Sequence, residues 1–233
     1  MKTLLALVTT SGLLCLTSAF GSIYLDQSQP IVDTTVGANA VGGSSDQLLA
    51  QVATAGMSGW LNSVGLPVAG SGTLIVQIER VNGGIPNGTV LTSQTIPGSS
   101  LPDFLSDPTG FRRLDLSAPV NFSAGDQFAI VLSVLNAATD DFSLLQGPLG
   151  DPYQGGAAFF NSQPNPAGIW VPLGDFGRSD LPFQTYVTPV PEPGVLSLII
   201  LAGLVPWSLR FTRAAWRWLM GLLLHGENRV AVW

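Results

Sequence analysis

The sequence has a single cysteine, Cys15, and a single histidine, His225, among its 233 residues. Neither falls within residues 20–188, which make up most of the chain. That stretch therefore excludes disulfide bonds, a thiol nucleophile and a thiolate metal site. The lack of histidine also excludes a Ser-His-Asp relay and an imidazole-bound zinc ion there. These absences argue against ordinary serine hydrolases and zinc enzymes.

Basic residues are scarce in the same stretch. It contains four arginines, no lysine and thirteen acidic residues, which gives a net charge of minus nine. Such a balance repels phosphate backbones and anionic lipids. The charge therefore argues against nucleic acid as a partner and against an electrostatic grip on membranes. It is typical of a surface that is kept soluble by its acids.

Patterns of long amphipathic helices are absent as well, and the periodicity is that of β-strands. Apolar residues at every second position of residues 72–81 precede the turn sequence Asn82-Gly83-Gly84, and a second run follows at residues 88–96. This region predicts a hairpin. Further strands are predicted at residues 113–116, 127–135, 157–160, 169–173 and 183–187.

Residues 47–59 are ambiguous, because their apolar residues fit one face of a helix whereas Gly56 and Gly59 interrupt it. We assign them to a strand. Residues 97–108, rich in serine, proline and aspartate, predict a long loop. Many short strands with glycine and proline between them predict an all-β fold, an antiparallel β-sandwich of the jelly-roll type. Residues 20–188 have the length of one such domain.

The first residues have the three parts of a secretory signal peptide. Lys2 precedes an apolar run at residues 4–16 and a stretch of small residues that ends at Ala19. Cleavage after Ala19 is expected, so that residues 1–19 form the signal and the following domain is exported.

A second apolar segment follows a proline-rich motif near the C-terminus. The motif is Val190-Pro191-Glu192-Pro193-Gly194, whose prolines favour an extended tether that a processing enzyme can grip. Residues 194–209 are uncharged and span about 24 Å as a helix, somewhat less than the ~30 Å hydrocarbon core of a bilayer. Arg210, Arg213 and Arg217 follow, and the positive-inside rule places them in the cytoplasm. The sequence thus predicts a single transmembrane helix with the motif outside.

This order of Pro-Glu-Pro, apolar helix and basic residues resembles the PEP-CTERM sorting signal of Gram-negative bacteria, which is processed by an exosortase, a membrane cysteine protease. The resemblance covers residues 189–217. Residues 218–233 form an extension past the point where members of that family usually end. The resemblance implies an exosortase-type partner, transient anchoring in the inner membrane, and a final place at the cell surface or outside the cell. An ordinary single-span anchor is the alternative.

The exported stretch has a second resemblance. Ile85-Pro86-Asn87-Gly88-Thr89-Val90-Leu91, the run from Phe122 to Leu132, and Trp170 resemble an exported module of the choice-of-anchor type, which occurs upstream of alternative cell-surface anchors. The likeness spans residues 26–187 and rests on turn glycines and expected core residues. It implies a β-sandwich on an interchangeable anchor and transfers no functional residue.

Aromatic and acidic side chains supply the remaining candidates for a site. Tyr153 and Trp170 lie in loops rich in glycine and proline, where exposed rings can stack on a sugar, and packing in the core is the competing interpretation. The adjacent acids Asp140 and Asp141 leave a carboxylate-based hydrolase open, with solvation of a loop as the simpler explanation. No organic cofactor is predicted. Calcium suits acidic loops, but no EF-hand spacing is present, so a metal site stays undefined.

Three hypotheses for function follow. The leading one is an exported, non-enzymatic protein of the cell surface or extracellular matrix, processed at its C-terminal sorting signal. The alternative is a carbohydrate-binding module that uses aromatic stacking, with extracellular polysaccharide as its partner. A carboxylate-based glycoside hydrolase is the third.

Overall fold

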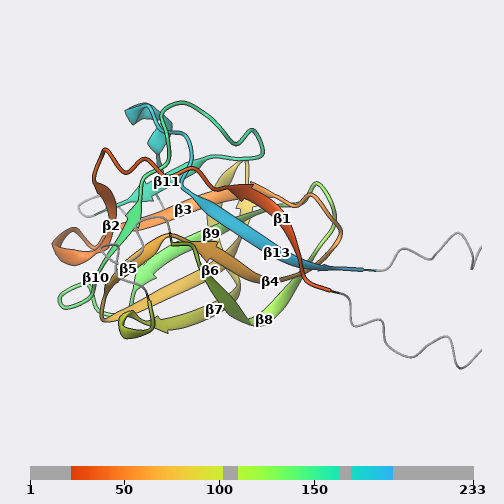
Figure 1. The fold of residues 1–233 in the computed structure, drawn as a ribbon, viewed down its shortest axis with the longest axis horizontal. Helices are drawn as coiled ribbons and strands as arrows, with labels where there is room; N and C mark the ends of the chain where they lie inside the picture. Colours follow the sequence, from red (N-terminus) through yellow and green to blue (C-terminus); the bar gives the residue numbers. More distant parts are fainter. Residues whose placement is uncertain (1–21, 102–109, 163–168, 191–233) are drawn as a thin grey trace, which may run out of the picture. The chain divides into compact units, whose positions relative to one another are not determined.

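The computed structural model describes residues 22–101, 110–162 and 169–190. The chain divides after Val190 into two units, and all the described residues belong to the first of them. Within this unit the regular secondary structure consists almost entirely of antiparallel strands (Figure 1). The predicted signal peptide and the predicted transmembrane helix lie outside the described residues.

The strands form two main sheets and a smaller third one. The largest sheet has the order β12 (Val171–Pro172), β11 (Ala158–Asn161), β3 (Leu48–Thr54), β9 (Gln127–Val134), β6 (Thr73–Asn82) and β7 (Ile85–Pro97). The second has the order β1 (Tyr24–Gln29), β13 (Phe183–Pro189), β4 (Gly59–Leu66) and β8 (Arg112–Phe122). The third has the order β2 (Ala38–Gly42), β10 (Asp141–Leu145) and β5 (Val68–Ser71). The short 3-10 helices are η2 (Gly43–Ser45), η3 (Gly98–Ser100) and η4 (Leu173–Phe176).

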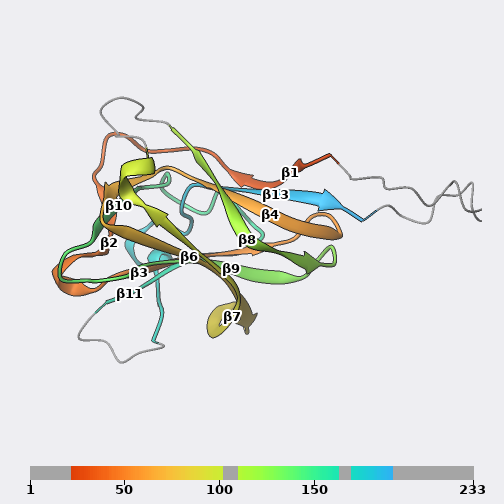
Figure 2. The same ribbon diagram turned by 90° about the horizontal axis from the view of Figure 1, so that it is seen from below.

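The two main sheets lie in two layers, with the four-stranded sheet above the six-stranded sheet in Figure 2. Apolar side chains at every second position of each strand face the space between the layers, as the pleat of a strand requires. The buried residues there include Leu61, Val64, Leu114, Phe183 and Val187 from one sheet and Leu74, Val76, Ile78, Phe128 and Ile130 from the other. The rings of Phe122 on β8 and Phe128 on β9 stack with centroids 4.7 Å apart. The fold is therefore all-β and sandwich-like, as the sequence predicts.

The outer face of the six-stranded sheet carries a second apolar cluster. It consists of Ala50, Val52, Ala129, Val131 and Phe159, with Val81, Ala157 and Trp170 packed against it. β3 and β9 are consequently buried on both faces. Strands buried on both faces have continuous apolar runs instead of a clean alternation.

Most predicted strands are confirmed. The hairpin is β6–β7, in which Asn82 pairs with Ile85 and the two central glycines, Gly83 and Gly84, have φ of +61° and +80°. Positive φ at both positions is what a type I′ turn requires. The strands predicted at residues 113–116, 127–135, 157–160 and 183–187 correspond to β8, β9, β11 and β13.

The ambiguous residues 47–59 contain β3 and the start of β4, so the assignment to a strand is confirmed. The strand predicted at residues 169–173 is shorter in the structure, because Pro172 cannot donate to a ladder and η4 begins directly after it. The prediction omitted the short strands β1, β2, β5 and β10 and all of β4 beyond Gly59. Of the predicted loop at residues 97–108, the described part contains η3.

Gly59 allows β13 to approach β4 at the end of the four-stranded sheet. A Cβ atom at this position would lie 2.7 Å from Val187 Cγ1 and 2.8 Å from the Cα of Pro189, and it would also contact the carbonyl oxygen of Thr188. Because two of these atoms belong to the backbone of β13, the strand itself would have to move. We expect Gly59→Ala to lower the free energy of unfolding of residues 20–190 by about 1–3 kcal/mol in urea titrations.

Gly37→Ala is the matched control, because no heavy atom lies within 4 Å of a Cβ at that position. Its free energy of unfolding should stay within about 0.5 kcal/mol of the wild-type value. Equal effects of the two substitutions would contradict the close approach of β13 to β4.

Candidate functional site

The end of the fold coincides with the start of the predicted sorting motif. β13 ends at Pro189, and the amide of Val190 donates to the carbonyl of Ser58 at 3.1 Å. Of the motif, Val190 is described, while Pro191, Glu192, Pro193 and Gly194 lie outside the described residues. The same holds for Arg210, Arg213 and Arg217. The last strand of the described residues therefore ends one residue before the Pro-Glu-Pro sequence.

The beginning of the fold lies next to its end. Tyr24, the first residue of β1, pairs with Val187 near the end of β13 (Figure 1). In the described part of the chain, no helix has the length and apolar character to cross a bilayer.

Tyr153 does not offer the exposed ring that its loop position suggested. Its side chain is 9% exposed and packs edge-on against Phe183, with ring centroids 5.0 Å apart. Its hydroxyl donates to Gln27 Oε1 at 3.1 Å and accepts from the Thr54 amide at 3.1 Å. The prediction of Tyr153 as a stacking residue is therefore corrected. The ring belongs to the core, and its hydroxyl forms hydrogen bonds with Gln27 on β1 and Thr54 on β3.

Trp170 is partly buried, because it packs against the apolar cluster on the outer face of the six-stranded sheet. The aromatic residues with largely exposed side chains are instead Tyr24 on β1 at 53%, Trp60 on β4 at 46% and Phe176 in η4 at 65%. The sequence shows that Trp60 is present, but not that its side chain faces outward. That orientation depends on the register of β4. Pairing of Trp60 with Thr188 and Asn121 sets that register.

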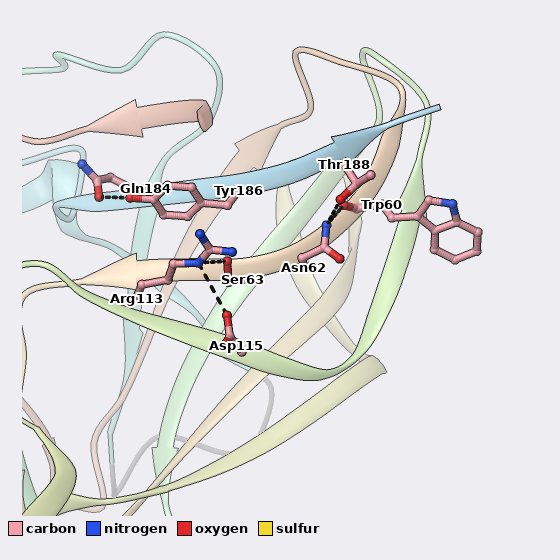
Figure 3. Close-up of polar contacts among 8 residues, drawn as sticks. All are labelled: Trp60, Asn62, Ser63, Arg113, Asp115, Gln184, Tyr186 and Thr188. Carbon is pink, nitrogen blue, oxygen red and sulfur yellow. Dashed lines mark hydrogen bonds and ion pairs between the residues drawn. The ribbon is translucent and has the colours of Figure 1, made fainter. Parts of the chain in front are cut away.

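The outer face of the four-stranded sheet carries a polar cluster around an arginine (Figure 3). The Nε of Arg113 donates to Ser63 Oγ at 2.7 Å and lies 3.5 Å from Asp115 Oδ1. The guanidinium group lies over the ring of Tyr186, 4.7 Å from its centroid. Contacts of this kind between exposed groups orient side chains and add little stability.

Two further hydrogen bonds organise the same face. Tyr186 donates its hydroxyl proton to Gln184 Oε1 at 2.8 Å, and Asn62 Nδ2 donates to Thr188 Oγ1 at 2.8 Å. The indole of Trp60 points away from this cluster, toward the end of the sheet at which β13 ends (Figure 3).

A cavity of about 300 Å³ opens beside η4, where the six-stranded and three-stranded sheets meet. Its lining combines side-chain amides, aromatic rings and one arginine: Asn39, Gln47, Gln146, Gly147, Phe160, Leu173, Phe176, Arg178, Asp180 and Leu181. Phe176 is 65% exposed and meets Phe160 edge-on, with ring centroids 5.7 Å apart. The cavity thus joins an exposed aromatic ring to neutral hydrogen-bonding groups.

Arg178 is held in place at the wall of this cavity. Its Nη2 pairs with Asp33 Oδ2 at 3.0 Å, and its Nη1 donates to the carbonyl of Gly147. Hydrogen bonds from the side chain and backbone of Thr35, and then from Arg178, lower the pKa of Asp33. Arg178, which precedes β13, therefore links the loop after β1 to the loop after β10. These two contacts hold its guanidinium group in place.

A buried carboxylate forms the floor of the cavity. Asp180 accepts from Gln51 Nε2 at 3.1 Å and from the Tyr153 amide at 3.0 Å, and the Leu181 amide donates to Gln51 Oε1 at 2.7 Å. Burial raises the pKa of Asp180 to about 6, with a further contribution from the carboxyl group of Asp151. The bonds to Gln51 and Tyr153 act in the opposite direction.

The acidic candidates for catalysis are used structurally where they are described. Asp140 is buried and accepts from the amides of Thr73 and Asn136 and from the hydroxyl of Thr139. Asp141 begins β10 and is exposed. In the described residues, no group of three or more acidic, histidine or cysteine side chains is placed to hold a metal ion.

No family model matches the chain, and no curated protein matches it in sequence.

Asp180 gives the fold a specific pH dependence. Its pKa is about 6 in the folded protein and near 3.8 when unfolded, so the folded state binds more protons between these values. Stability from this group is complete below pH 3.8 and is lost as the pH rises through 6. We expect Asp180→Asn, which stays neutral, to lack this loss, so that the stability of the variant relative to the wild-type protein rises from pH 4 to pH 7.

Urea titrations of residues 20–190 at pH 4, 5, 6 and 7 measure this effect. The control is Asp175→Asn, because Asp175 is exposed and lies in η4 beside the cavity. Its free energy of unfolding should change with pH as in the wild-type protein. Wild-type and Asp180→Asn profiles that run parallel over the whole range would contradict the assignment.

Proposed function

We propose that the chain is an exported protein of the cell surface or extracellular matrix, non-enzymatic, and processed at a C-terminal sorting signal. The observation that carries this proposal is the position at which the folded unit ends. Its last strand finishes at Pro189 and its boundary falls after Val190, immediately before Pro191-Glu192-Pro193. A cut in that sequence would separate the exported unit from the apolar segment without removing a strand.

The topology supports processing after Val190 and not before it. β13 lies between β1 and β4, and its residues Phe183 and Val187 are buried in the core. A cut within β13 would unpair both neighbours, so the first expendable residues are those of the proline motif. Prolines there prevent the strand from continuing and favour an extended segment.

The finer assignments belong to the same proposal. Residues 1–19 are a signal peptide, residues 189–217 are the sorting signal with a single transmembrane helix, and residues 218–233 are an extension. The sandwich is of the jelly-roll type. The partners are an exosortase-type membrane protease and, before processing, the inner membrane, with the C-terminus in the cytoplasm. The mature protein is at the cell surface or outside the cell.

The proline motif provides the direct test. In the double variant Pro191→Ala with Pro193→Ala, two backbone donors return and the apolar helix can extend toward the domain, which hides the extended segment. We expect the wild-type C-terminus to be lost and the variant to accumulate in the membrane at full length. Mass spectrometry of the C-termini in the membrane and medium fractions measures this. Identical intact C-termini in the wild-type protein and the variant would mean that the segment is an anchor and not a processed sorting signal.

The arginines make a separate contribution. Replacing Arg210, Arg213 and Arg217 with glutamine should impair membrane orientation, because these residues keep the C-terminal side in the cytoplasm. The circular dichroism of the exported unit should remain that of a β-protein. Protease accessibility of a C-terminal tag in spheroplasts measures the orientation, and an unchanged orientation would refute the role of the arginines.

Carbohydrate binding is the second candidate, and the cavity beside η4 favours it. Sugars are bound by rings that stack on their apolar faces and by neutral polar groups that bond their hydroxyls. Phe176 with Asn39, Gln47 and Gln146 supplies both kinds of group in one cavity. The site lies beyond the start of β13, about 20 Å along the strand from Pro189, which leaves it open when the other end is tethered.

Glycan arrays with residues 20–190 test this candidate. Phe176→Ala and Gln146→Ala should each weaken retention of a bound polysaccharide about tenfold, because each removes a stacking or hydrogen-bonding contact of roughly 1–1.5 kcal/mol. Trp60→Ala, on the other main sheet, is the control and should bind as wild type. Loss of binding with Trp60→Ala alone would move the sugar site to the four-stranded sheet.

A further inference from the structure

We propose that the exported unit docks onto the lipid bilayer through an apolar patch at its tethered end while the C-terminal anchor is in place. The patch consists of Ile23, Tyr24, Leu25, Trp60 and Val190 and is called the docking patch below. This inference rests on the proposed function, because it requires the apolar segment after Gly194 to be in the membrane.

Strand register brings the docking patch together. Tyr24 pairs with Val187, Leu25 with Tyr186, and Trp60 with Thr188, all within four residues of Val190 along β13 or its partners. The order β1–β13–β4 places the two outer strands on either side of the strand that leads to the tether. The five residues therefore lie at the end of the sheet where the described chain begins and ends. Because side chains alternate along a strand, Tyr24 lies on the face of Val187 and Leu25 on the face of Tyr186, so that the docking patch is formed by the edge of the sheet.

Each member of the docking patch is 45–53% exposed. The other large exposed apolar residues of the described chain lie in the loop after β1, on the edge strand β7, directly after β9 at Leu135, and in η4 and the loops around it. Clustered exposed apolar side chains mark a surface that meets a partner, whereas single ones need no explanation. The tethered end has such a cluster.

The tether determines which partner this surface meets. Three residues separate Val190 from Gly194, which starts the uncharged run, and in an extended form the four Cα–Cα steps span at most about 14 Å. With that run in the bilayer, the docking patch cannot leave the vicinity of the headgroups. The effective concentration of the lipid surface at the docking patch is then higher than that of a ligand free in solution.

The composition of the docking patch also favours lipid over sugar. Tryptophan and tyrosine are enriched at membrane interfaces, where an apolar ring and a polar tip are both satisfied. Ile23, Leu25 and Val190 have no ring to stack on a sugar, but their aliphatic side chains can enter the boundary between headgroups and acyl chains. No member of the patch is charged.

Charge predicts the kind of lipid surface. Residues 20–188 carry a net charge of minus nine, so anionic headgroups repel the unit as a whole. Docking by apolar contact should therefore be stronger on phosphatidylcholine than on phosphatidylglycerol, and the difference should shrink as salt screens the repulsion.

The test uses residues 20–233, which lack the proposed signal peptide and Cys15, reconstituted into phosphatidylcholine vesicles that contain headgroup-nitroxide lipid. A single environment-sensitive fluorophore is attached at Asn121→Cys, which pairs with Trp60, or at Leu135→Cys, beyond the far end of β9. Docking predicts strong quenching at position 121 and weak quenching at position 135. Trp60→Ala with Leu25→Ala should reduce quenching at position 121 to the level at position 135.

Phe176→Ala with Leu149→Ala is the matched control, because it removes one exposed aromatic and one exposed leucine near the cavity. It should leave quenching at position 121 unchanged. A chain that floats with the vesicles but shows equally weak quenching at both positions would overturn docking and leave the anchor intact. A chain that does not float would overturn the anchor and docking together.

Sugar recognition by the same patch is the remaining outcome. In that case immobilised polysaccharide would retain the same chain, Trp60→Ala would abolish this retention, and quenching at position 121 would be weak. These results would assign the docking patch to a sugar and overturn docking on lipid.

Discussion

The structure depends on the pairing made by its last strand. β13 lies between β1 and β4, so that Val187 pairs with Tyr24 on one side and with Leu61 on the other. The same strand buries Phe183 in the core, where the ring of Tyr153 packs against it. Without β13, β1 would have no partner in its sheet. The first and last strands of the described chain therefore stabilise each other, and β13 ends beside β1 at Pro189.

Most of the fold could be predicted from local patterns, because strands such as β6 alternate and turns such as Gly83-Gly84 need positive φ. β3 was ambiguous for a physical reason: the sheet buries both of its faces, so Leu49 and Ala53 meet the core while Ala50 and Val52 meet the outer cluster. Periodicity cannot separate such a run from a buried helix. The short strands β2, β5 and β10 owe their pairing to distant partners, which no local window contains.

The candidate sites were less predictable than the strands. Tyr153 lies in a loop, yet its ring is buried because the loop folds inward over Phe183 and its hydroxyl finds Gln27 and Thr54. Trp60 is exposed because the register of β4 turns it outward, and that register is set by β13 and β8. The cavity beside η4 combines residues from five separate segments of the chain. Composition shows that such residues are present, but it does not show that they lie close together in the fold.

The position of β13 also sets the order in which the fold can be completed. Synthesis from the N-terminus provides β1 and β4 long before their shared partner, and until then both have unpaired edges that can template pairing with other chains. Contacts between residues as distant as Tyr24 and Val187 form slowly. The four-stranded sheet is complete only once the chain up to Pro189 is free to pair. Closure of this sheet therefore waits for the C-terminal end of the described chain, however early its other strands are made.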